Sequence, residues 1–558
     1  MKKLFESHPV GTVFAFALVC LLPLMALRDF SPANELRYLS IADESFSSGH
    51  VLTLFNGGAA YADKPPLYFW FIEFCKLLFG GHYMLPLALL SFACVFGIAC
   101  VMDKWALKGA DALTRGAAAM MLLSSSLMLG MAVYVRMDLL MCLFIVLALY
   151  SFWRGKPSLF ALFSFLGLFT KGPVGLLLPL LSVLVWLCLR RDWKGIVRWM
   201  GWRFFLIVGG LSAIWLGGVY LEGGKEYFDN LVFHQTAGRA VNAFAHKEPV
   251  WFYLLVIWGV TAPWCLLTVP SVVISLRLKV LGAASPENSA AASPEGFFAV
   301  VSLVAVVMLS LFSSKIALYL LPIFPMLVYG FALLSSRTGL RGWMKWGMGF
   351  AAGLFILIGL ALFAGFFALG YIDSLSDFAF LRTGMMALVG IAAVWAGISV
   401  FCGLGAGWQK GVLTLGVTLL AGLFCLSFKL PEINRISSYG PLCDDILRVE
   451  SIRAAFVPGE AGGLSSSFAG LTGESPGQVY TVGLYRPENI DVYLGAGRRG
   501  VAVPPDELQN WLINRIPEDA TIVLEKSTDE AYCSRLSGLL RASGRTPYPS
   551  DPLYTIWR

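Results

Sequence analysis

Two short polar motifs, NELRY at residues 34–38 and YADKPP at residues 61–66, interrupt a chain that is otherwise largely lipid-soluble before residue 428. Both motifs lie in the segment 29–80, which follows the first apolar run and gathers carboxylates, an arginine, a lysine and many aromatic residues. Ionisable side chains are costly to keep beside a membrane, so such a segment is a candidate functional site. The remaining chain then forms the scaffold and supplies the residues that contact this segment.

The composition is that of an integral membrane protein. Hydrophobic residues make up 57% of the chain and charged residues only 14%, with a mean hydropathy of +0.72, whereas soluble domains carry about 25% charged residues. The basic residues fall in short clusters between apolar runs, so the net charge of +7 does not indicate a nucleic-acid partner. No CxxC pair occurs among the 11 cysteines, which argues against a zinc ribbon or a thioredoxin-type site.

Apolar runs of suitable length predict about thirteen membrane-spanning helices. The first is expected to be an uncleaved span rather than a signal peptide, because no small-x-small site precedes Arg28. Lysine and arginine gather in alternate short loops, which are therefore cytoplasmic; the segments 28–81, 222–250 and 371–383, and everything after residue 428, are then outside. The predicted spans lie near residues 10–27, 82–102, 117–135, 138–153, 157–170, 174–189, 204–221, 251–275, 297–313, 316–335, 346–370, 384–406 and 411–428.

The chain is predicted to have two domains, a membrane domain at residues 1–428 and a small α/β domain at residues 429–558. The second has an ordinary soluble composition and is large enough to bury its own core. Residues 479–484 and 520–524 read as buried strands, and residues 505–512 read as a helix with an acidic first turn. We also expect a disulfide between Cys443 and Cys533, which follow residue 428 and would lie in an oxidising compartment.

Two short helices are predicted within the first outer loop, at residues 35–47 and 67–79. The prolines at 65 and 66 suit the first turn of the second helix, which is dominated by aromatic residues. Because each helix is too short to span a bilayer, we expect both to be interfacial helices at the outer surface. This arrangement would hold the charged groups of the two motifs near the lipid headgroups.

Other ionisable residues are predicted at the same outer face, where few cations are expected. Cations at the ends of spans commonly serve only as snorkelling anchors. As a set they can instead converge on one outer cavity and bind a phosphate, through point charges and an arginine fork. The predicted cations are Lys64, Arg136, Lys171, Arg239 and Lys315.

In the order and spacing of these motifs, the chain resembles bacterial GT-C glycosyltransferases of the protein O-mannosyltransferase and aminoarabinose (lipid A) transferase superfamily. The first outer loop of that family typically reads Asp-Glu-x-Arg-Tyr and then Tyr-x-(Glu/Asp)-Lys-Pro, which correspond to residues 34–38 and 61–65. Its second outer turn carries an aspartate, here Asp138; its Lys-Gly-Pro turn begins at Lys171. The family's His-x4-Arg pattern corresponds to His234 and Arg239.

The resemblance implies a mainly α, polytopic GT-C fold with a small outer α/β domain. It implies an inverting transferase of the bacterial inner membrane that moves a sugar from a polyprenyl-phosphate carrier to lipid A, another glycan or lipid, or a protein, with no nucleic acid involved. The implied catalytic residues are Glu35, Asp63, Asp138 and Asn34. The motifs and the outer charges together give these candidate substrate-binding residues: Arg37, Tyr38, Tyr61, Lys64, Arg136, Lys171, His234, Arg239, Lys315 and Tyr319. Apart from the resemblance, Asp63 with His234 is a candidate pair for a divalent metal ion.

The sequence departs from the family pattern at Asn34, where the relatives carry the aspartate that orients or deprotonates the acceptor. An amide cannot take up a proton, so three interpretations remain. Glu35, Asp63 or Asp138 supplies the carboxylate; or the acceptor is a phosphate or another ionised group that needs no base; or the protein is inactive.

Two other classes of protein fit a many-span chain. A transporter or flippase of lipid-linked sugars usually places ionisable residues at the bilayer midplane and shows repeated halves; here they cluster at one predicted face and the halves differ in loop length. A scaffold that only presents the outer domain would not need Lys64, Arg239 and Lys315. A glycosyltransferase is therefore the favoured prediction, with the flippase as the alternative.

Overall fold

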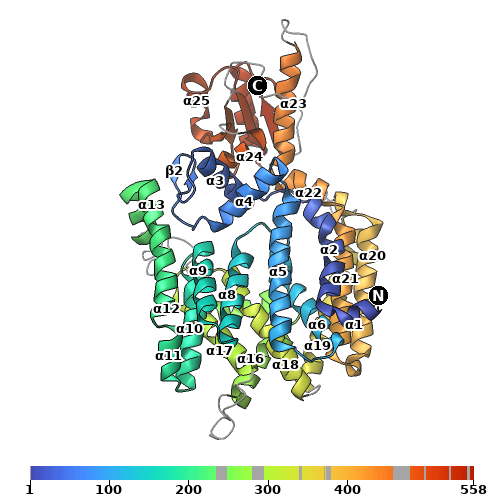
Figure 1. Cartoon of the computed structure of the whole chain (residues 1–558). Helices are drawn as coiled ribbons and strands as arrows, with labels where there is room; N and C mark the ends of the chain where they lie inside the picture. The colour runs from blue at the N-terminus through green and yellow to red at the C-terminus, as the bar shows by residue number, and fades with distance from the viewer. Residues whose placement is uncertain are drawn as a thin grey trace. The chain divides into compact units, whose positions relative to one another are not determined.

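The computed structural model of the chain describes residues 2–233, 248–279, 294–338, 342–369, 371, 379–456, 478–495, 498–526, 529–548 and 553–558 (Figure 1). Up to residue 428 these residues are almost entirely helical. The helices are α1 (Lys2–Ser7), α2 (Pro9–Leu27), α3 (Glu35–Ser47), α4 (Leu67–Phe79), α5 (Met84–Ala106), α6 (Ala112–Leu123), α7 (Ser126–Ala132), α8 (Asp138–Trp153), α9 (Pro157–Lys171), α10 (Val174–Leu189), α11 (Trp193–Trp199), α12 (Trp202–Phe204), the π-helical turn η1 (Phe205–Gly209), α13 (Gly210–Asp229), α15 (Phe252–Val260), α16 (Cys265–Lys279), α17 (Pro294–Leu311), the 3₁₀ helix η4 (Ala317–Ile323), α18 (Phe324–Thr338), α19 (Gly342–Ala368), α20 (Gly384–Cys402), the 3₁₀ turn η6 (Leu404–Ala406) and α21 (Trp408–Ser427).

The helices confirm that the chain is a polytopic membrane protein. Within the described residues, eight helices are long and apolar enough to cross a membrane, or nine if the bent pair α6–α7 forms one span. Shorter apolar helices, namely α8, α9, α10 and Cys265–Arg277 of α16, fall below this length and lie at four further predicted spans. The predicted span 251–275 is broken into α15 and α16, and Pro263, which has no N–H to donate, lies in the break.

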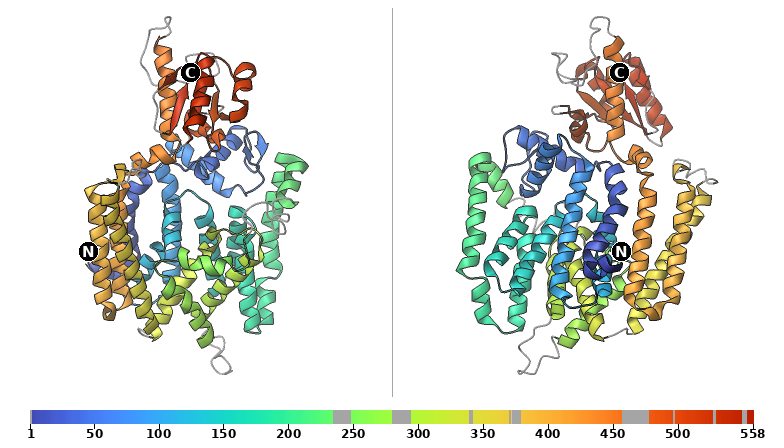
Figure 2. Two further views of the ribbon diagram at one scale, coloured as in Figure 1. Left: turned by 180° about the vertical axis from the view of Figure 1, so that it is seen from behind. Right: turned by 45° about the vertical axis from the view of Figure 1, so that its right-hand side comes forward.

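Glycines let neighbouring helices approach until their backbones touch. A Cβ added to Gly167 of α9 would lie 2.7 Å from the carbonyl oxygen of Gly175 in α10, and one added to Gly359 of α19 would lie 2.5 Å from that of Gly390 in α20. The long α19–α20 pair lies side by side in both views of Figure 2. Close crossing through small residues is how helices pack in lipid, where no hydrophobic effect draws them together.

The described residues cluster into two compact units. The first, which we call the helical unit, contains Met1–Leu27, Tyr61–Tyr68 and Leu85–Phe428. The second, which we call the loop–sheet unit, contains Arg28–Ala60, Phe69–Met84 and Lys429–Arg558. Most of the first predicted loop thus groups with the C-terminal segment, a partition that hydropathy cannot reveal because it depends on contacts between residues hundreds of positions apart.

The C-terminal segment has the predicted mixture of helix and strand. Its sheet has the order β4-β3-β5-β7-β6, with β3 parallel to β4 and β5, and β7 antiparallel to β5 and β6. Strands β3 and β5 cover most of the two runs predicted as buried strands, and the predicted helix at 505–512 appears as η8 followed by α25. The elements are α22 (Leu430–Ser437), α23 (Gly440–Phe456), β3 (Val479–Val482), η7 (Pro487–Ile490), α24 (Asp491–Leu494), β4 (Gly500–Ala502), η8 (Pro505–Glu507), α25 (Leu508–Asn514), β5 (Thr521–Glu525), α26 (Glu530–Ala542), β6 (Pro547–Tyr548) and β7 (Tyr554–Trp557).

The expected disulfide in this segment is wrong. Cys443 lies buried in α23 and Cys533 lies partly exposed in α26, and no disulfide joins them. Burial raises the pKa of the Cys443 thiol, since the thiolate would lose its hydration there. The prediction rested only on the compartment and on counting cysteines, neither of which brings two helices into bonding distance.

The two helices predicted in the first loop form as α3 and α4, and a short hairpin of β1 (Phe55–Asn56) and β2 (Ala59–Ala60) lies between them in the sequence. The apolar face of α3 is covered by protein, because Leu36 and Leu39 are fully buried. Helix α4 instead exposes Phe74, Leu77 and Leu78, an apolar surface that suits contact with lipid. The two helices of the loop therefore differ in their surroundings.

Asp43 ties α3 to α4. Its Oδ1 accepts hydrogen bonds from Lys76 (2.6 Å) and from His82 (2.7 Å). Burial raises the pKa of the Asp43 carboxyl, but the contacts with His82 and Lys76 lower it further, so the net pKa lies below its ordinary value. Asp43 therefore stays ionised and holds the two segments together through charge-assisted hydrogen bonds.

Candidate active site

A buried group of charges forms around Asp138 in the helical unit. Arg136 donates from Nε to Oδ2 of Asp138 at 3.1 Å, and the ammonium of Lys171 binds Oδ1 of the same carboxylate. Asp138 is 1% exposed, and the Arg136 and Lys171 side chains are 13% and 9% exposed. We call Arg136, Asp138 and Lys171 the charge cluster; three residues that the sequence placed at outer turns are thus brought together.

Local structure explains why these residues meet. Asp138 begins α8 and Lys171 ends α9, and only a short turn separates the two helices. Because the helices run antiparallel, the start of one and the end of the next lie at the same level. The carboxylate also sits at the positive end of its helix dipole and the ammonium at the negative end of the other, which stabilises both charges.

Tyr319 extends this cluster, whereas Lys315 is held by a different group. The ammonium of Lys171 lies 4.7 Å from the centre of the Tyr319 ring, a cation–π contact that orients it further. Lys315 is 4% exposed, and its ammonium donates to the carbonyl oxygen of Glu248 at 2.9 Å. The structure therefore brings Tyr319 to the charge cluster and shows a backbone partner for the Lys315 ammonium; the predicted convergence of Lys64, Arg239 and Lys315 on one cavity stays a prediction.

The cluster places two basic side chains beside one carboxylate where water is scarce. Such a site attracts an anion, and a phosphate is the natural partner of an arginine beside a lysine. Both Asp138 oxygens already accept hydrogen bonds from cations. This carboxylate is therefore better suited to fixing the two cations than to accepting a proton from a substrate.

The second motif also belongs to the helical unit. The carbonyl oxygen of Tyr61 accepts a hydrogen bond from the Tyr227 hydroxyl of α13 at 3.1 Å. Tyr61 is buried, whereas Asp63 and Lys64 are only partly buried. The prolines that follow fix the exit of the chain into α4. Asp63 and Lys64 thus lie on a segment that is anchored at both ends.

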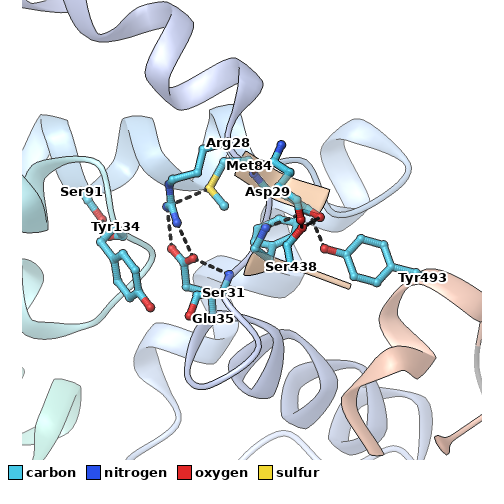
Figure 3. Close-up of polar contacts among 11 residues, drawn as sticks. Arg28, Asp29, Ser31, Glu35, Met84, Ser91, Tyr134, Ser438 and Tyr493 are labelled. Carbon is cyan, nitrogen blue, oxygen red and sulfur yellow. Dashed lines mark hydrogen bonds and ion pairs between the residues drawn. The ribbon is translucent and has the colours of Figure 1, made fainter. Parts of the chain in front are cut away.

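Glu35 joins two parts of the chain within the loop–sheet unit. Its carboxylate forms a bidentate pair with Arg28, with distances of 2.6 and 2.7 Å, and also accepts from the backbone N–H of Ser31 at 2.9 Å (Figure 3). The residue is fully buried. A carboxylate held by this many donors closes the turn before α3, which is a structural role. The expected catalytic role of Glu35 stays a prediction.

A Glu35→Gln variant should therefore lose stability rather than chemistry alone. Removing one charge of a buried, bidentate hydrogen bond costs about 1.5–3 kcal/mol. Thermal unfolding of the purified protein in detergent measures this loss. Glu432→Gln is the control, because its pair with Lys429 lies at the surface and should contribute less than about 1 kcal/mol. An unchanged midpoint for Glu35→Gln, together with lost activity, would restore Glu35 as a candidate base.

The other residues of the first motif surround the start of α3. Asn34 is the N-cap residue of α3 but makes no side-chain capping bond. Arg37 is partly buried. Tyr38 is buried, and its ring packs edge-to-face with that of Phe69 of α4, with the ring centroids 5.7 Å apart. Tyr38 therefore helps to pack α3 against α4, which is a structural reason for an aromatic residue at this position.

His234 and Arg239 lie outside the described residues, so their predicted roles stay predictions. The same holds for the Asp63–His234 metal pair. Among the residues that the structure describes, no group of three or more histidine, cysteine, aspartate or glutamate side chains could hold a metal ion.

Sequence reasoning missed three residues that hold the two motifs and the first loop in place. Arg28 holds Glu35, Tyr227 holds the Tyr61 backbone, and Asp29 joins the first loop to the C-terminal segment by accepting from Ser438 (2.7 Å) and Tyr493 (2.5 Å) (Figure 3). The only signal in the sequence was that Arg28 and Asp29 end the first apolar run. Nothing local indicates which distant residues these charges would contact.

Comparison of sequences finds relatives but no matching family model. The chain is 26% identical over 283 residues to an undecaprenyl phosphate-alpha-4-amino-4-deoxy-L-arabinose arabinosyl transferase of Pseudomonas fluorescens, a match that covers 48% of each chain. It is 27% identical over 276 residues to the protein of that name from Shewanella sediminis, covering 47% of this chain and 49% of the relative. The chain thus spans about half the length of the relatives it matches.

Comparison of structures covers almost the whole chain. The crystal structure of ArnT from Cupriavidus metallidurans bound to undecaprenyl phosphate matches with a TM-score of 0.73 and 17% identity, over 98% of this chain and 97% of that one. The same protein in the apo state matches with a TM-score of 0.69. This likeness confirms the predicted GT-C fold, and with the sequence matches it confirms the predicted resemblance to the aminoarabinose transferase superfamily.

Proposed function

We propose that this chain is an inverting glycosyltransferase that moves a sugar from a polyprenyl-phosphate carrier to an acceptor in the bacterial envelope. The observation that carries the proposal is the buried Arg136–Asp138–Lys171 cluster. It offers positive charge away from bulk water, in a fold shared with a protein whose crystal structure holds undecaprenyl phosphate. Such a site suits the phosphate of a lipid-linked sugar donor.

The chemistry follows from where charge develops. The acceptor attacks C1 of the sugar from the face opposite the phosphate while the C1–O bond to the phosphate breaks, so the configuration at C1 inverts. The bonding electrons leave with the phosphate oxygen, which gains negative charge. Cations already in place, Lys64 together with Arg136 and Lys171, stabilise that charge without reorganising. Asp138 keeps the two cluster cations oriented while they do so.

The contacts of the proposed carboxylates bear on whether the acceptor is a hydroxyl or an ionised group. Glu35 and Asp138 both accept hydrogen bonds from cations. Of the three proposed carboxylates, we assign Asp63 to a hydroxyl acceptor because it lies next to Lys64 in the YADKPP motif. The alternative, favoured by the amide at Asn34, is an acceptor that is already ionised, such as a phosphate of lipid A. In that case no general base is needed.

The orientation is also a proposal, which the alternation of lysine and arginine between loops supports. The first outer loop, the charge cluster and the C-terminal segment then face the periplasm, where polyprenyl-linked rather than nucleotide-linked sugars are available. In this organisation residues 1–428 are the transferase domain and residues 429–558 a periplasmic α/β domain.

The test uses the purified full-length protein in liposomes with undecaprenyl phosphate-4-amino-4-deoxy-L-arabinose as donor and lipid A as acceptor. Mass spectrometry should show lipid A gaining one aminosugar while undecaprenyl phosphate is released. If this donor is inert, lipid-linked sugars from cells with and without the gene identify the native donor, which should accumulate without it. Movement of a lipid-linked sugar between leaflets, with no glycosylated product from any such donor, would contradict transfer and support the flippase alternative.

A further inference from the structure

Arg499, in the C-terminal segment just before β4, joins two carboxylates from different parts of the loop–sheet unit. Its Nη2 lies 2.6 Å from Oε2 of Glu44, which belongs to α3 in the first loop. Its Nε donates to Oδ2 of Asp491, the first residue of α24, at 3.3 Å. The guanidinium fork thus connects the C-terminal segment to a helix more than four hundred residues earlier in the sequence.

Glu44, which Arg499 binds, also binds the β1–β2 turn. Its carboxylate also accepts hydrogen bonds from the backbone N–H groups of Gly57 (2.7 Å) and Gly58 (2.6 Å). Both glycines have positive φ, 66° and 79°, the conformation that glycine adopts without strain. The turn therefore depends on charge-assisted bonds to one carboxylate, which Arg499 in turn holds in place.

Asp491 gives Arg499 a second anchor on α3. Asp491 is 8% exposed, and its Oδ2 also accepts from the Ser40 hydroxyl at 3.2 Å. Ser40 and Glu44 are four residues apart and so share one face of α3. Burial raises the pKa of the Asp491 carboxyl, while Ser40 and Arg499 oppose that rise. Arg499 therefore also compensates a buried negative charge.

The β1–β2 turn lies directly before the YADKPP motif in the sequence, so the contacts of Arg499 bear on this motif. Strand β2 ends at Ala60, and the chain continues directly into the YADKPP motif with Asp63 and Lys64. We propose that Arg499 is a positioning residue, which holds Glu44 and the β1–β2 turn and thereby sets the segment that presents Asp63 and Lys64 to the lipid-phosphate donor. The donor part of this inference rests on the proposed function; the part that concerns the turn does not.

The turn can be tested without any assay of activity. Hydrogen–deuterium exchange of the full-length protein in detergent should show faster exchange in peptides covering residues 55–60 in Arg499→Gln, because the N–H groups of Gly57 and Gly58 lose an ordered acceptor. Peptides covering β5 should keep their rate. Arg535→Gln is the matched control: its pair with Asp506 lies on the same segment but is exposed on both sides, so residues 55–60 should not change.

A second pair of variants tests the route through Glu44. If Arg499 acts by holding Glu44, exchange at residues 55–60 in Glu44→Gln should be at least as fast as in Arg499→Gln, and the double variant should add little to Glu44→Gln alone. Arg499→Lys should restore protection in part, because an ammonium can reach one carboxylate but lacks the fork that holds two. Unchanged exchange at residues 55–60 in both Arg499→Gln and Glu44→Gln would overturn the positioning role.

The link to the donor needs a kinetic measurement on folded protein. A small misplacement of Lys64 should lower kcat/KM for the donor about 10- to 100-fold, with KM for the acceptor unchanged and with partial rescue by Arg499→Lys. A purely structural Arg499 would change the unfolding midpoint but leave the donor kinetics of the folded fraction unaltered, and that result would overturn the link. If the wild type transfers no sugar from any polyprenyl donor, the proposed function fails, while the exchange experiment still decides the positioning of the turn.

Discussion

The Asp138→Asn variant is expected to lose at least about a hundredfold in the rate of sugar transfer, as other sites do when a preorganised stabilising group is lost. The amide keeps the shape of the side chain but removes the only negative charge that we find in the charge cluster. Arg136 and Lys171 would then face each other as buried like charges and turn away from their present positions. The same change should lower the free energy of unfolding by about 3–5 kcal/mol, because it breaks a buried ion pair.

Two measurements separate these effects. Turnover is measured per folded molecule, and thermal unfolding is measured in the same detergent. Asp103→Asn is the matched control, because Asp103 is a buried carboxylate of the same unit that pairs with Arg115 at 2.9 and 2.5 Å, outside the charge cluster. It should lose stability but keep its turnover. Equal turnover for Asp138→Asn and Asp103→Asn, per folded molecule, would show that the cluster only supports the fold.

The Lys64→Ala variant should lose transfer on the order of a hundredfold while keeping nearly normal stability. Lys64 is only partly buried, so its removal exposes no large cavity, and its proposed role is to stabilise charge on the leaving phosphate. Because that charge grows as the bond breaks, most of the loss should appear in kcat. Donor-concentration series with purified protein measure kcat and KM separately.

The control for Lys64 comes from the same loop. Lys76 pairs with Asp43 and is also partly exposed, but it lies on α4 beyond the motif, so Lys76→Ala should change turnover only a few-fold. Lys64→Arg should recover part of the activity because it keeps the charge at a different geometry. Near-normal transfer by Lys64→Ala at wild-type protein levels would place the phosphate site elsewhere.

Much of the local structure could be predicted from the sequence because the signals are local. Each predicted span lies largely on helix, and α3, α4, β3 and β5 form close to where their patterns predicted them. Hydrophobic runs and strand patterns depend on near neighbours in the chain, as does the start of a helix after a proline. The proximity of Asp138 and Lys171 could also be predicted, because the start of one helix and the end of the next antiparallel helix lie at the same level.

The assignment of individual charges needed the tertiary structure. The sequence offered Glu35 and Asp138 as equivalent candidate bases, but the contacts make one a clamp for Arg28 and the other a holder of two cations. It also could not show that the Lys315 ammonium donates to the carbonyl oxygen of Glu248. A carboxylate or ammonium takes whichever partner the packed chain brings within reach, and its own neighbours in the sequence do not encode that partner.

Contacts between residues far apart in the sequence could not be predicted either. The sequence by itself determined an apolar helical chain, two polar motifs in its first outer loop and a small α/β segment at its end. Only the tertiary structure decided that most of this loop groups with that segment, through Asp29 with Ser438 and Tyr493 and through Glu44 with Arg499. Helices and strands arise from interactions over a few residues, whereas these contacts form only once the whole chain has packed.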